Sequence, residues 1–223
     1  MNTEDRGVRV VISDFGGVMT NPLMDSFIAY ERQTGIPLEV LGAAMDAIMD
    51  RDGEHPLFEL EKGLLSEADF TRMMQDELGA RLEREIEFHT FPDTYFEHLH
   101  PNQRYLDFLF EYKATGGRLA LLTNNVREWE HRWRGMLPID ELFETVVDSG
   151  FVGTRKPERR IYEITHERIV KLDGLGDIEP RHCVLVDDIA VNCEAAREFG
   201  FLAVQFVETE QAIAETRAIL AGG

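Results

Sequence analysis

The chain has 223 residues, and its 42 acidic side chains against 23 basic ones give a formal net charge of -19 at pH 7. A chain this acidic lacks the surplus of Lys and Arg that binding to nucleic acids or anionic membranes requires, so we expect neither partner. With 43% hydrophobic and 29% charged residues, the composition is that of a folded globular protein and excludes a disordered acidic chain.

The two cysteines are too few for the disulfide framework of a small secreted protein. No run of about 20 apolar residues predicts a membrane-spanning helix, and the sequence MNTEDRGVRV at the start lacks the apolar segment of a signal peptide. We therefore expect a cytoplasmic protein that is a monomer or a homodimer.

Five short apolar runs have the β-branched, nearly continuous character of strands that are buried on both faces of a parallel sheet. They cover residues 8–12, 118–122, 143–147, 183–186 and 201–206. Segments with helical periodicity lie between the later runs, near residues 126–136, 157–172 and 190–199. Strands that alternate with helices predict an α/β fold with a doubly wound parallel sheet.

A long interval without strand signals follows the first run, and connections of that length are structured. Helical patterns fill it: one ends at Gly35, a plausible C-cap, and another begins at Ser66, which is followed by acidic residues as in a capping box. We therefore predict a helical cap over residues 20–96, inserted into an α/β core of residues 1–19 and 97–223.

Polar residues follow four of the apolar runs directly. They are Asp14, the segment Thr123-Asn124-Asn125, the pair Asp148-Ser149, and the pair Asp187-Asp188. The carboxyl ends of parallel strands line one crevice, so these groups are expected to converge. Asp14, Asp187 and Asp188 would then repel one another unless a cation lay between them, and oxygen ligands suit Mg²⁺.

Lys156 lies just before a predicted helix and would offer its ammonium to an anion in the same crevice. The hydroxyl of Thr123 and the amides of Asn124 and Asn125 open another helix and would do the same. Taken singly, each of these residues is more typical of a turn, a helix cap or a solvated helix start. As an ordered set they indicate a phosphoryl site with a metal.

Four motifs carry a resemblance to the haloacid dehalogenase-like hydrolase superfamily. They are VVISDFGGVMT, LALLTNN, GTRKPERRIY and VLVDDIAVNCEAAREFG, in that order and with the helical insertion after the first. Within the superfamily they are most similar to the phosphatase domain of soluble epoxide hydrolases and its bacterial relatives. The resemblance implies a Mg²⁺-dependent hydrolase that removes phosphate from a small organic phosphate.

The resemblance also implies a role for individual residues. Asp14 would be the nucleophile that forms an aspartyl-phosphate. Thr123, the Asn124 amide and Lys156 would bind the transferred phosphoryl group, and Lys156 would neutralise its charge. The metal ligands would be Asp14, the main-chain carbonyl of Gly16, Asp187 (directly or through water) and Asp188. Asn192 would support the acidic pair.

Gly16 departs from the family pattern, because phosphatases of this kind usually have there an Asp that protonates the leaving group. Loss of a general acid typically lowers the rate on the order of 10² to 10⁴. Three interpretations are open: the substrate has a leaving group that needs little protonation, a cap residue such as His55 or Glu54 supplies the proton, or the fold binds phosphorylated ligands or partners without turnover. A haloacid dehalogenase is a disfavoured alternative, because those enzymes lack the acidic pair seen at Asp187-Asp188.

Overall fold

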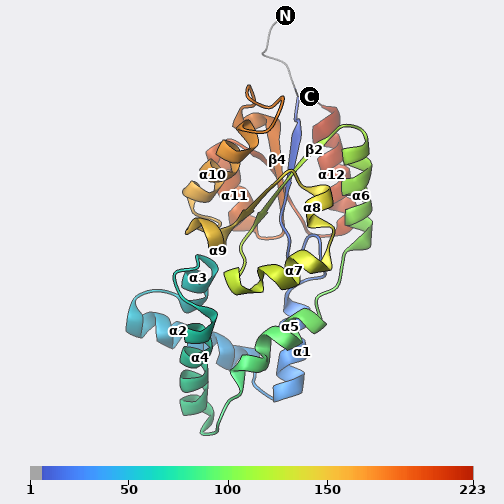
Figure 1. Ribbon diagram of the computed structural model, residues 1–223. Helices are drawn as coiled ribbons and strands as arrows, with labels where there is room; N and C mark the ends of the chain where they lie inside the picture. Colours follow the sequence, from blue (N-terminus) through green and yellow to red (C-terminus); the bar gives the residue numbers. More distant parts are fainter. Residues whose placement is uncertain (1–6, 223) are drawn as a thin grey trace, which may run out of the picture.

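The computed structural model describes residues 7–222, and its centre is a five-stranded sheet in the order β3-β2-β1-β4-β5 (Figure 1). All four strand pairings are parallel. The strands are β1 (Val10–Ser13), β2 (Arg118–Thr123), β3 (Thr145–Asp148), β4 (Cys183–Asp187) and β5 (Leu202–Gln205). The predicted doubly wound sheet is confirmed, and each predicted run overlaps one strand.

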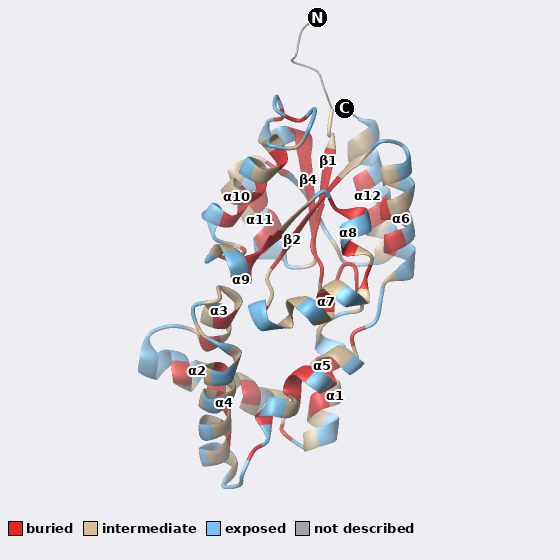
Figure 2. Ribbon diagram, viewed as in Figure 1, coloured by how far each residue is buried: buried red, intermediate tan, exposed pale blue. Residues whose placement is uncertain are grey.

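Helices cover both faces of the sheet because alternate residues of each buried strand point to opposite faces. Val11 of β1 belongs to the apolar cluster that faces α6 (Gln103–Ala114) and α12 (Thr209–Ala221). Its neighbour Ile12 belongs to the cluster that faces α10 (Arg159–Val170) and α11 (Ala190–Phe199). Figure 2 shows these central strands as buried throughout. The residues at the carboxyl edge of the sheet are therefore attached to strands that are packed on both faces.

Between β1 and β2 the chain forms five α-helices that extend beyond the carboxyl edge of the sheet (Figure 1). We call them the inserted helices: α1 (Met24–Thr34), α2 (Leu38–Asp52), α3 (Pro56–Glu61), α4 (Glu67–Leu82) and α5 (Phe91–Glu97), with a 3-10 turn η2 at Phe88–Thr90. They pack around an apolar cluster that also includes Val126, from the segment after β2. Gly35 ends α1 at a φ of 68°, and the Ser66 side chain caps α4 by accepting from the Asp69 N–H, as their sequences predict.

The chain leaves and re-enters the α/β core at a single place. Thr20 and Pro101 form an isolated antiparallel bridge, and the Asn21 N–H donates to the His100 carbonyl over 2.9 Å. The Asn21 side chain accepts from the His100 N–H at 2.7 Å and donates to the His98 carbonyl at 3.1 Å. These bonds join the segment that leads into the inserted helices to the segment that leads out of them, so both segments cross from the core at the same place.

The remaining short elements are η3 (Arg127–Trp129), α7 (Glu130–Met136), α8 (Ile139–Leu142), α9 (Ser149–Val152) and η4 (Pro180–His182). The predicted helix over residues 126–136 thus begins as a 3-10 turn. Helices α3, α5, α8, α9 and α12 were not predicted, and all but α12 have seven residues or fewer. None of the helices within residues 7–222 combines the length and apolar character that crossing a bilayer requires.

Candidate active site

Three carboxylates meet at the carboxyl edge of the sheet. Asp14 follows β1, Asp187 ends the neighbouring strand β4, and Asp188 comes next in the chain. One oxygen of each lies within 4.8 Å of the others, which is close enough for all three to contact one cation. Asp187 is fully buried and Asp14 nearly so, whereas Asp188 is partly exposed. The convergence follows from the parallel pairing of β1 with β4.

The Lys156 ammonium lies among three oxygen atoms. Its Nζ is 2.8 Å from Asp14 Oδ1 and 2.6 Å from Asp187 Oδ2, and it donates to the Leu122 carbonyl at 3.1 Å. Only 1% of the side chain is exposed. Because an ammonium has three N–H donors, this arrangement uses them all on the protein. Lys156 therefore acts on the charge and orientation of Asp14 directly.

The electrostatics of the cluster favour a further cation. Burial raises the pKa of Asp14 to about 8, against the lowering effect of Lys156, and the charges of Asp187 and Asp188 raise it as well. Burial and the charge of Asp187 raise the pKa of Asp188 to about 6. When all three carboxylates are ionised, as binding of a metal would require, one ammonium leaves two of their negative charges uncompensated. A divalent cation would neutralise them, so the residues present fit Mg²⁺.

Each Asp187 oxygen has a defined partner. Oδ2 faces Lys156, while Oδ1 accepts from the Asn192 side chain and from the Ile189 N–H, both at 2.9 Å. Asn192 lies on the first turn of α11 and is buried. By contrast, Asp14 Oδ1 accepts from the Phe15 N–H at 2.7 Å, and Asp14 Oδ2 accepts no hydrogen bond from residues 7–222. Asp14 Oδ2 is the oxygen left available for chemistry.

Two adjacent glycines allow close contacts of the main chain, Gly17 with a carboxylate and Gly16 with a leucine. Gly17 has a φ of 75°, and a Cβ there would lie 2.4 Å from Asp188 Oδ2. A Cβ on Gly16 would lie 2.9 Å from both terminal methyl carbons of Leu23. Leu23, just before α1, therefore fills the space beside position 16.

The Asn124 side chain binds the main chain of Lys156. It donates to the Lys156 carbonyl at 3.0 Å and accepts from the Lys156 N–H at 2.8 Å. This pair of bonds fixes the Lys156 main chain to the end of β2. Thr123 is buried beside it, and its hydroxyl donates to the Asn124 carbonyl over 3.4 Å. Sequence spacing does not reveal the Asn124–Lys156 contact, since the two residues are 32 positions apart.

The inserted helices contact the core beside Lys156. Glu61, the last residue of α3, forms a 2.7 Å ion pair with Arg155 Nε. The Arg155 guanidinium lies 3.9 Å from the centre of the Phe58 ring. The His55 ring stacks on Phe58, with 4.2 Å between the two ring centres. Glu54 is exposed. Neither Glu61 nor Arg155 was predicted as a site residue, although Arg155 directly precedes Lys156.

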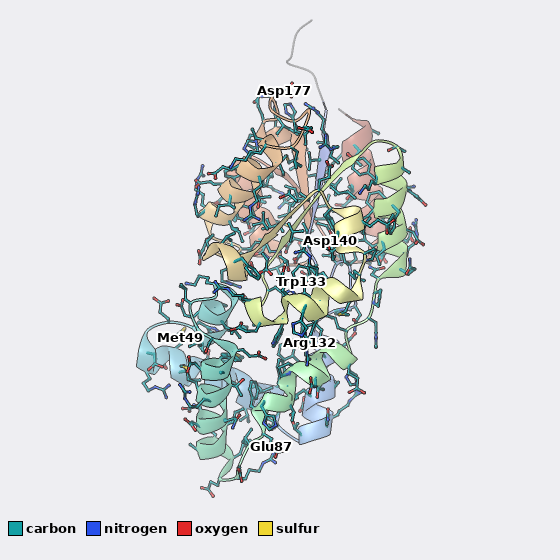
Figure 3. The ribbon with its side chains drawn as sticks, in the orientation of Figure 1. Met49, Glu87, Arg132, Trp133, Asp140 and Asp177 are labelled. Atoms are coloured by element: carbon teal, nitrogen blue, oxygen red, sulfur yellow. The ribbon has the colours of Figure 1, made fainter. Side chains whose placement is uncertain are left out.

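A second contact joins α7 to α5. Trp133 on α7 is buried and packs edge-on against Phe15, which follows Asp14 (Figure 3). Arg132 on the same helix forms an ion pair with Asp93 and lies over the ring of Phe96, both on α5. The inserted helices thus contact the core on two sides of the carboxylate cluster.

Trp129, from the segment after β2, also contacts side chains of the inserted helices. Trp129 lies 5.3 Å from Tyr95 by ring centres and donates its indole N–H to Glu67 at 2.7 Å. Phe27, Met45 and Leu57 pack against the apolar cluster of the inserted helices.

The geometry defines a site of three carboxylates and a buried lysine at the carboxyl edge of a doubly wound sheet, and comparison with known proteins gives its family. The model of the haloacid dehalogenase-like hydrolases matches residues 8–200, so the chain belongs to that family. In sequence it is 28% identical over 225 residues to acyl-CoA dehydrogenase family member 10 of Mus musculus. That match covers 96% of this chain but 19% of the mouse protein, so the chain spans about a fifth of that relative.

Solved structures of two bacterial enzymes share the fold. A haloacid dehalogenase (HAD) family enzyme of Bacteroides thetaiotaomicron has a TM-score of 0.68 at 20% identity, with 90% of this chain and 94% of that one covered. The same enzyme with magnesium and inorganic phosphate has a TM-score of 0.59 at 19% identity, with 89% and 94% covered. The L-2-haloacid dehalogenase of Xanthobacter autotrophicus has a TM-score of 0.61 at 17% identity, with 97% and 84% covered.

Proposed function

We propose that this protein is a Mg²⁺-dependent phosphatase that acts on a small organic phosphate, with residues 20–96 as its cap. The observation that carries the proposal is the position of the Lys156 ammonium between Asp14 and Asp187, with Asp188 completing a cluster of three carboxylates. This arrangement provides a nucleophilic carboxylate, a fixed positive charge and oxygen ligands for a metal. The magnesium and phosphate bound to the B. thetaiotaomicron enzyme support it by analogy.

The metal would be held by Asp14, Asp188 and the Gly16 carbonyl, with Asp187 as a direct or water-mediated ligand. When bound, Mg²⁺ supplies positive charge to the phosphoryl oxygens. The protein itself keeps Asp14 oriented, because Lys156 and the Phe15 N–H both hold Oδ1. Thr123 and the main chain of Asn124 would bind the phosphoryl oxygens from the side of β2.

In the reaction that we propose, Asp14 Oδ2 attacks phosphorus, and the bond from phosphorus to the leaving oxygen breaks. The leaving oxygen departs with the bonding electrons and takes one proton from solvent. The phosphoryl group is then an acyl phosphate on Asp14. Water attacks this phosphorus in the second step, which releases inorganic phosphate, restores the Asp14 carboxylate and returns one proton to solvent. Each step keeps Lys156 beside Oδ1, where its charge favours the ionised carboxylate.

The substrate follows from what position 16 lacks. Residue 16 is glycine, so no carboxyl at that position protonates the leaving oxygen. Leu23 occupies the space beside it. The site therefore favours an acyl, anomeric or aryl phosphate, whose leaving group needs little protonation. His55 and Glu54 remain the alternative proton donors from the cap. A phosphate-binding module without turnover is the alternative of a different class.

A haloacid dehalogenase is the second candidate activity, favoured by the likeness to the X. autotrophicus enzyme and by the absence of an acid at position 16. The acidic cluster around Asp188 disfavours it, since that reaction does not use a metal. Likewise, the closer resemblance to the phosphatase domain of soluble epoxide hydrolases stays a prediction.

A hydrolysis screen over acyl, aryl, sugar and alkyl phosphates, with and without Mg²⁺, tests the proposal. We expect release of phosphate that requires both Mg²⁺ and an intact Asp14, so that Asp14→Asn abolishes it. Equal background for wild type and Asp14→Asn on every compound, together with binding of inorganic phosphate, would support the non-catalytic module. Metal-independent release of chloride from 2-chloropropionate would support the dehalogenase.

A further inference from the structure

We propose that Glu61 and Arg155 are a positioning pair, through which docking of the inserted helices onto the core sets the place of Lys156. The proposal rests on the proposed function only in that Lys156 serves the Asp14 nucleophile. Glu61 lies outside the four sequence motifs, and Arg155 lies inside the third of them but was given no role there. The two residues are 94 positions apart in the chain.

Arg155 holds the end of α3 in two ways. Its Nε lies 2.7 Å from Glu61 Oε2, and its guanidinium lies 3.9 Å from the centre of the Phe58 ring, one helical turn earlier. Both charged side chains are largely buried, with 16% and 17% of their surface exposed. A planar guanidinium suits a carboxylate and a ring face together, so Arg155 fixes the direction of α3 as well as its distance.

The main chain reinforces the same contact. The Ser149 hydroxyl donates to the Glu61 carbonyl at 2.6 Å and accepts from the Asn125 N–H at 3.0 Å. Gly63 passes so close to the core that a Cβ there would lie 2.3 Å from the Gly150 carbonyl oxygen. The end of α3 therefore contacts the segment from Ser149 to Arg155 and, through Ser149, the turn after β2.

These contacts lead to Lys156 by a short route. Arg155 is covalently joined to Lys156, and the Lys156 main chain is held on its other side by Asn124. The Lys156 ammonium in turn holds Asp14 Oδ1. Release of Arg155 from Glu61 would remove one of the two restraints on the Lys156 main chain. Lys156 would then hold Asp14 less firmly, and a small displacement of this nucleophile lowers the rate.

The buried Glu61 carboxyl also depends on Arg155. Burial raises the pKa of Glu61, while the charge and hydrogen bond of Arg155 lower it. Removal of Arg155 leaves a buried carboxyl without its partner, so Arg155→Gln is expected to disturb the contact more than Glu61→Gln does.

The test uses the full chain with Glu61→Gln, Arg155→Gln, the double variant and the conservative Arg155→Lys. Glu77→Gln is the matched control, because Glu77 is similarly buried and pairs with Arg81 and Arg51 within the inserted helices, away from the core. Amide hydrogen exchange over residues 149–156 is the first readout. We expect faster exchange there in Glu61→Gln and Arg155→Gln, a smaller effect in Arg155→Lys, and wild-type exchange in Glu77→Gln.

The second readout is kcat and KM for aryl phosphates at saturating Mg²⁺. We expect kcat to fall roughly three- to a hundredfold, with KM changed less, and the double variant to lose no more than Arg155→Gln alone. The loss should be the same for good and poor leaving groups. A loss in Glu61→Gln that grows with leaving-group pKa and is absent in Arg155→Gln would make Glu61 a proton donor and overturn the positioning role.

Wild-type exchange and wild-type kcat in Glu61→Gln would also overturn the proposal. If wild type hydrolyses no compound, the proposed function fails, but hydrogen exchange over residues 149–156 still decides whether the pair fixes this segment.

Discussion

Leu23 takes the space that a side chain on Gly16 would need: a Cβ at position 16 would lie 2.9 Å from each of its two methyl carbons. Gly16 does not have a φ in the left-handed region, so space rather than backbone conformation limits this position. The place of a general acid is thus taken by two residues together: Gly16, in the loop after β1, lacks the side chain, and Leu23, just before α1, fills its space.

The first prediction restores that acid. Gly16→Asp combined with Leu23→Ala is expected to raise hydrolysis of alkyl phosphates by up to about 10²-fold, because a carboxyl can then protonate the leaving oxygen. Gly16→Asp alone should gain less, since the Leu23 methyl groups must first move aside. The measurement is kcat/KM for a simple alkyl phosphate. Leu23→Ala alone is the control, and equal rates for it and the double variant would refute the explanation.

The second prediction concerns the wild-type protein and its substrates. Without an acid at position 16, kcat/KM should rise steeply as the pKa of the leaving group falls, with aryl and acyl phosphates at least about 10²-fold ahead of alkyl phosphates. A series of substituted phenyl phosphates measures the slope. A flat series would show that another group, such as His55, donates the proton.

The third prediction is that Lys156→Met destabilises the protein by about 3–5 kcal/mol, because it leaves Asp14 and Asp187 buried without a counter-charge. Urea unfolding in the absence of metal measures it. Arg72→Met is the control, since Arg72 pairs with Asp69 at the surface, where an ion pair contributes at most about 1 kcal/mol. Equal losses for the two variants would contradict the role of Lys156 within the carboxylate cluster.

The fourth prediction concerns the metal. Mg²⁺ at 100 times its Kd should stabilise the wild-type protein by about 2.7 kcal/mol, and EDTA should remove that gain. Asp188→Asn should abolish the shift in Tm on adding Mg²⁺ and raise Tm without metal, because it removes one charge from the cluster. The exposed Asp50→Asn serves as control. A full Mg²⁺ shift in Asp188→Asn would exclude Asp188 as a ligand.

The central sheet and the convergence at its edge could be predicted from the sequence because both follow from local patterns. Val10–Ser13 and Cys183–Asp187 are apolar runs buried on both faces, and an acid after each must lie at the shared edge of a parallel pair. Lys156 could be assigned to the same edge because it stands between a strand and a helix.

The contacts made by Leu23, Asn124 and Glu61 could not be predicted in this way, since they depend on how the inserted helices and the loops pack. Glu61 ends a helix of six residues, which is too short to show periodicity. Its partner Arg155 is 94 positions away, and no local rule relates the two. The same reason explains why the bonds from the Asn124 side chain to the Lys156 main chain could not be predicted.

The last prediction uses Asp148, which ends β3 and lies outside the carboxylate cluster. Burial is the main reason why its pKa rises from 3.8 to about 6, and the charge of Glu130 raises the pKa as well. The hydrogen bond from the Gly150 N–H and the charges of Arg127 and Arg134 lower the pKa. The folded state therefore holds a proton that the unfolded chain releases. The contribution of this proton to the free energy of unfolding is complete below about pH 3.8 and is lost as the pH rises through 6.

Asp148→Asn removes this dependence while its amide oxygen keeps the bond that Gly150 N–H makes to Oδ1 at 2.9 Å. The free energy of unfolding of the variant minus that of wild type should rise between pH 4 and pH 7 by up to about 3 kcal/mol and then stay level. Urea unfolding at several pH values measures the difference, in which the titrations shared by both proteins cancel. A difference that is constant from pH 4 to pH 8 would mean that Asp148 ionises normally, and that its buried Oδ2 reaches a partner in solution.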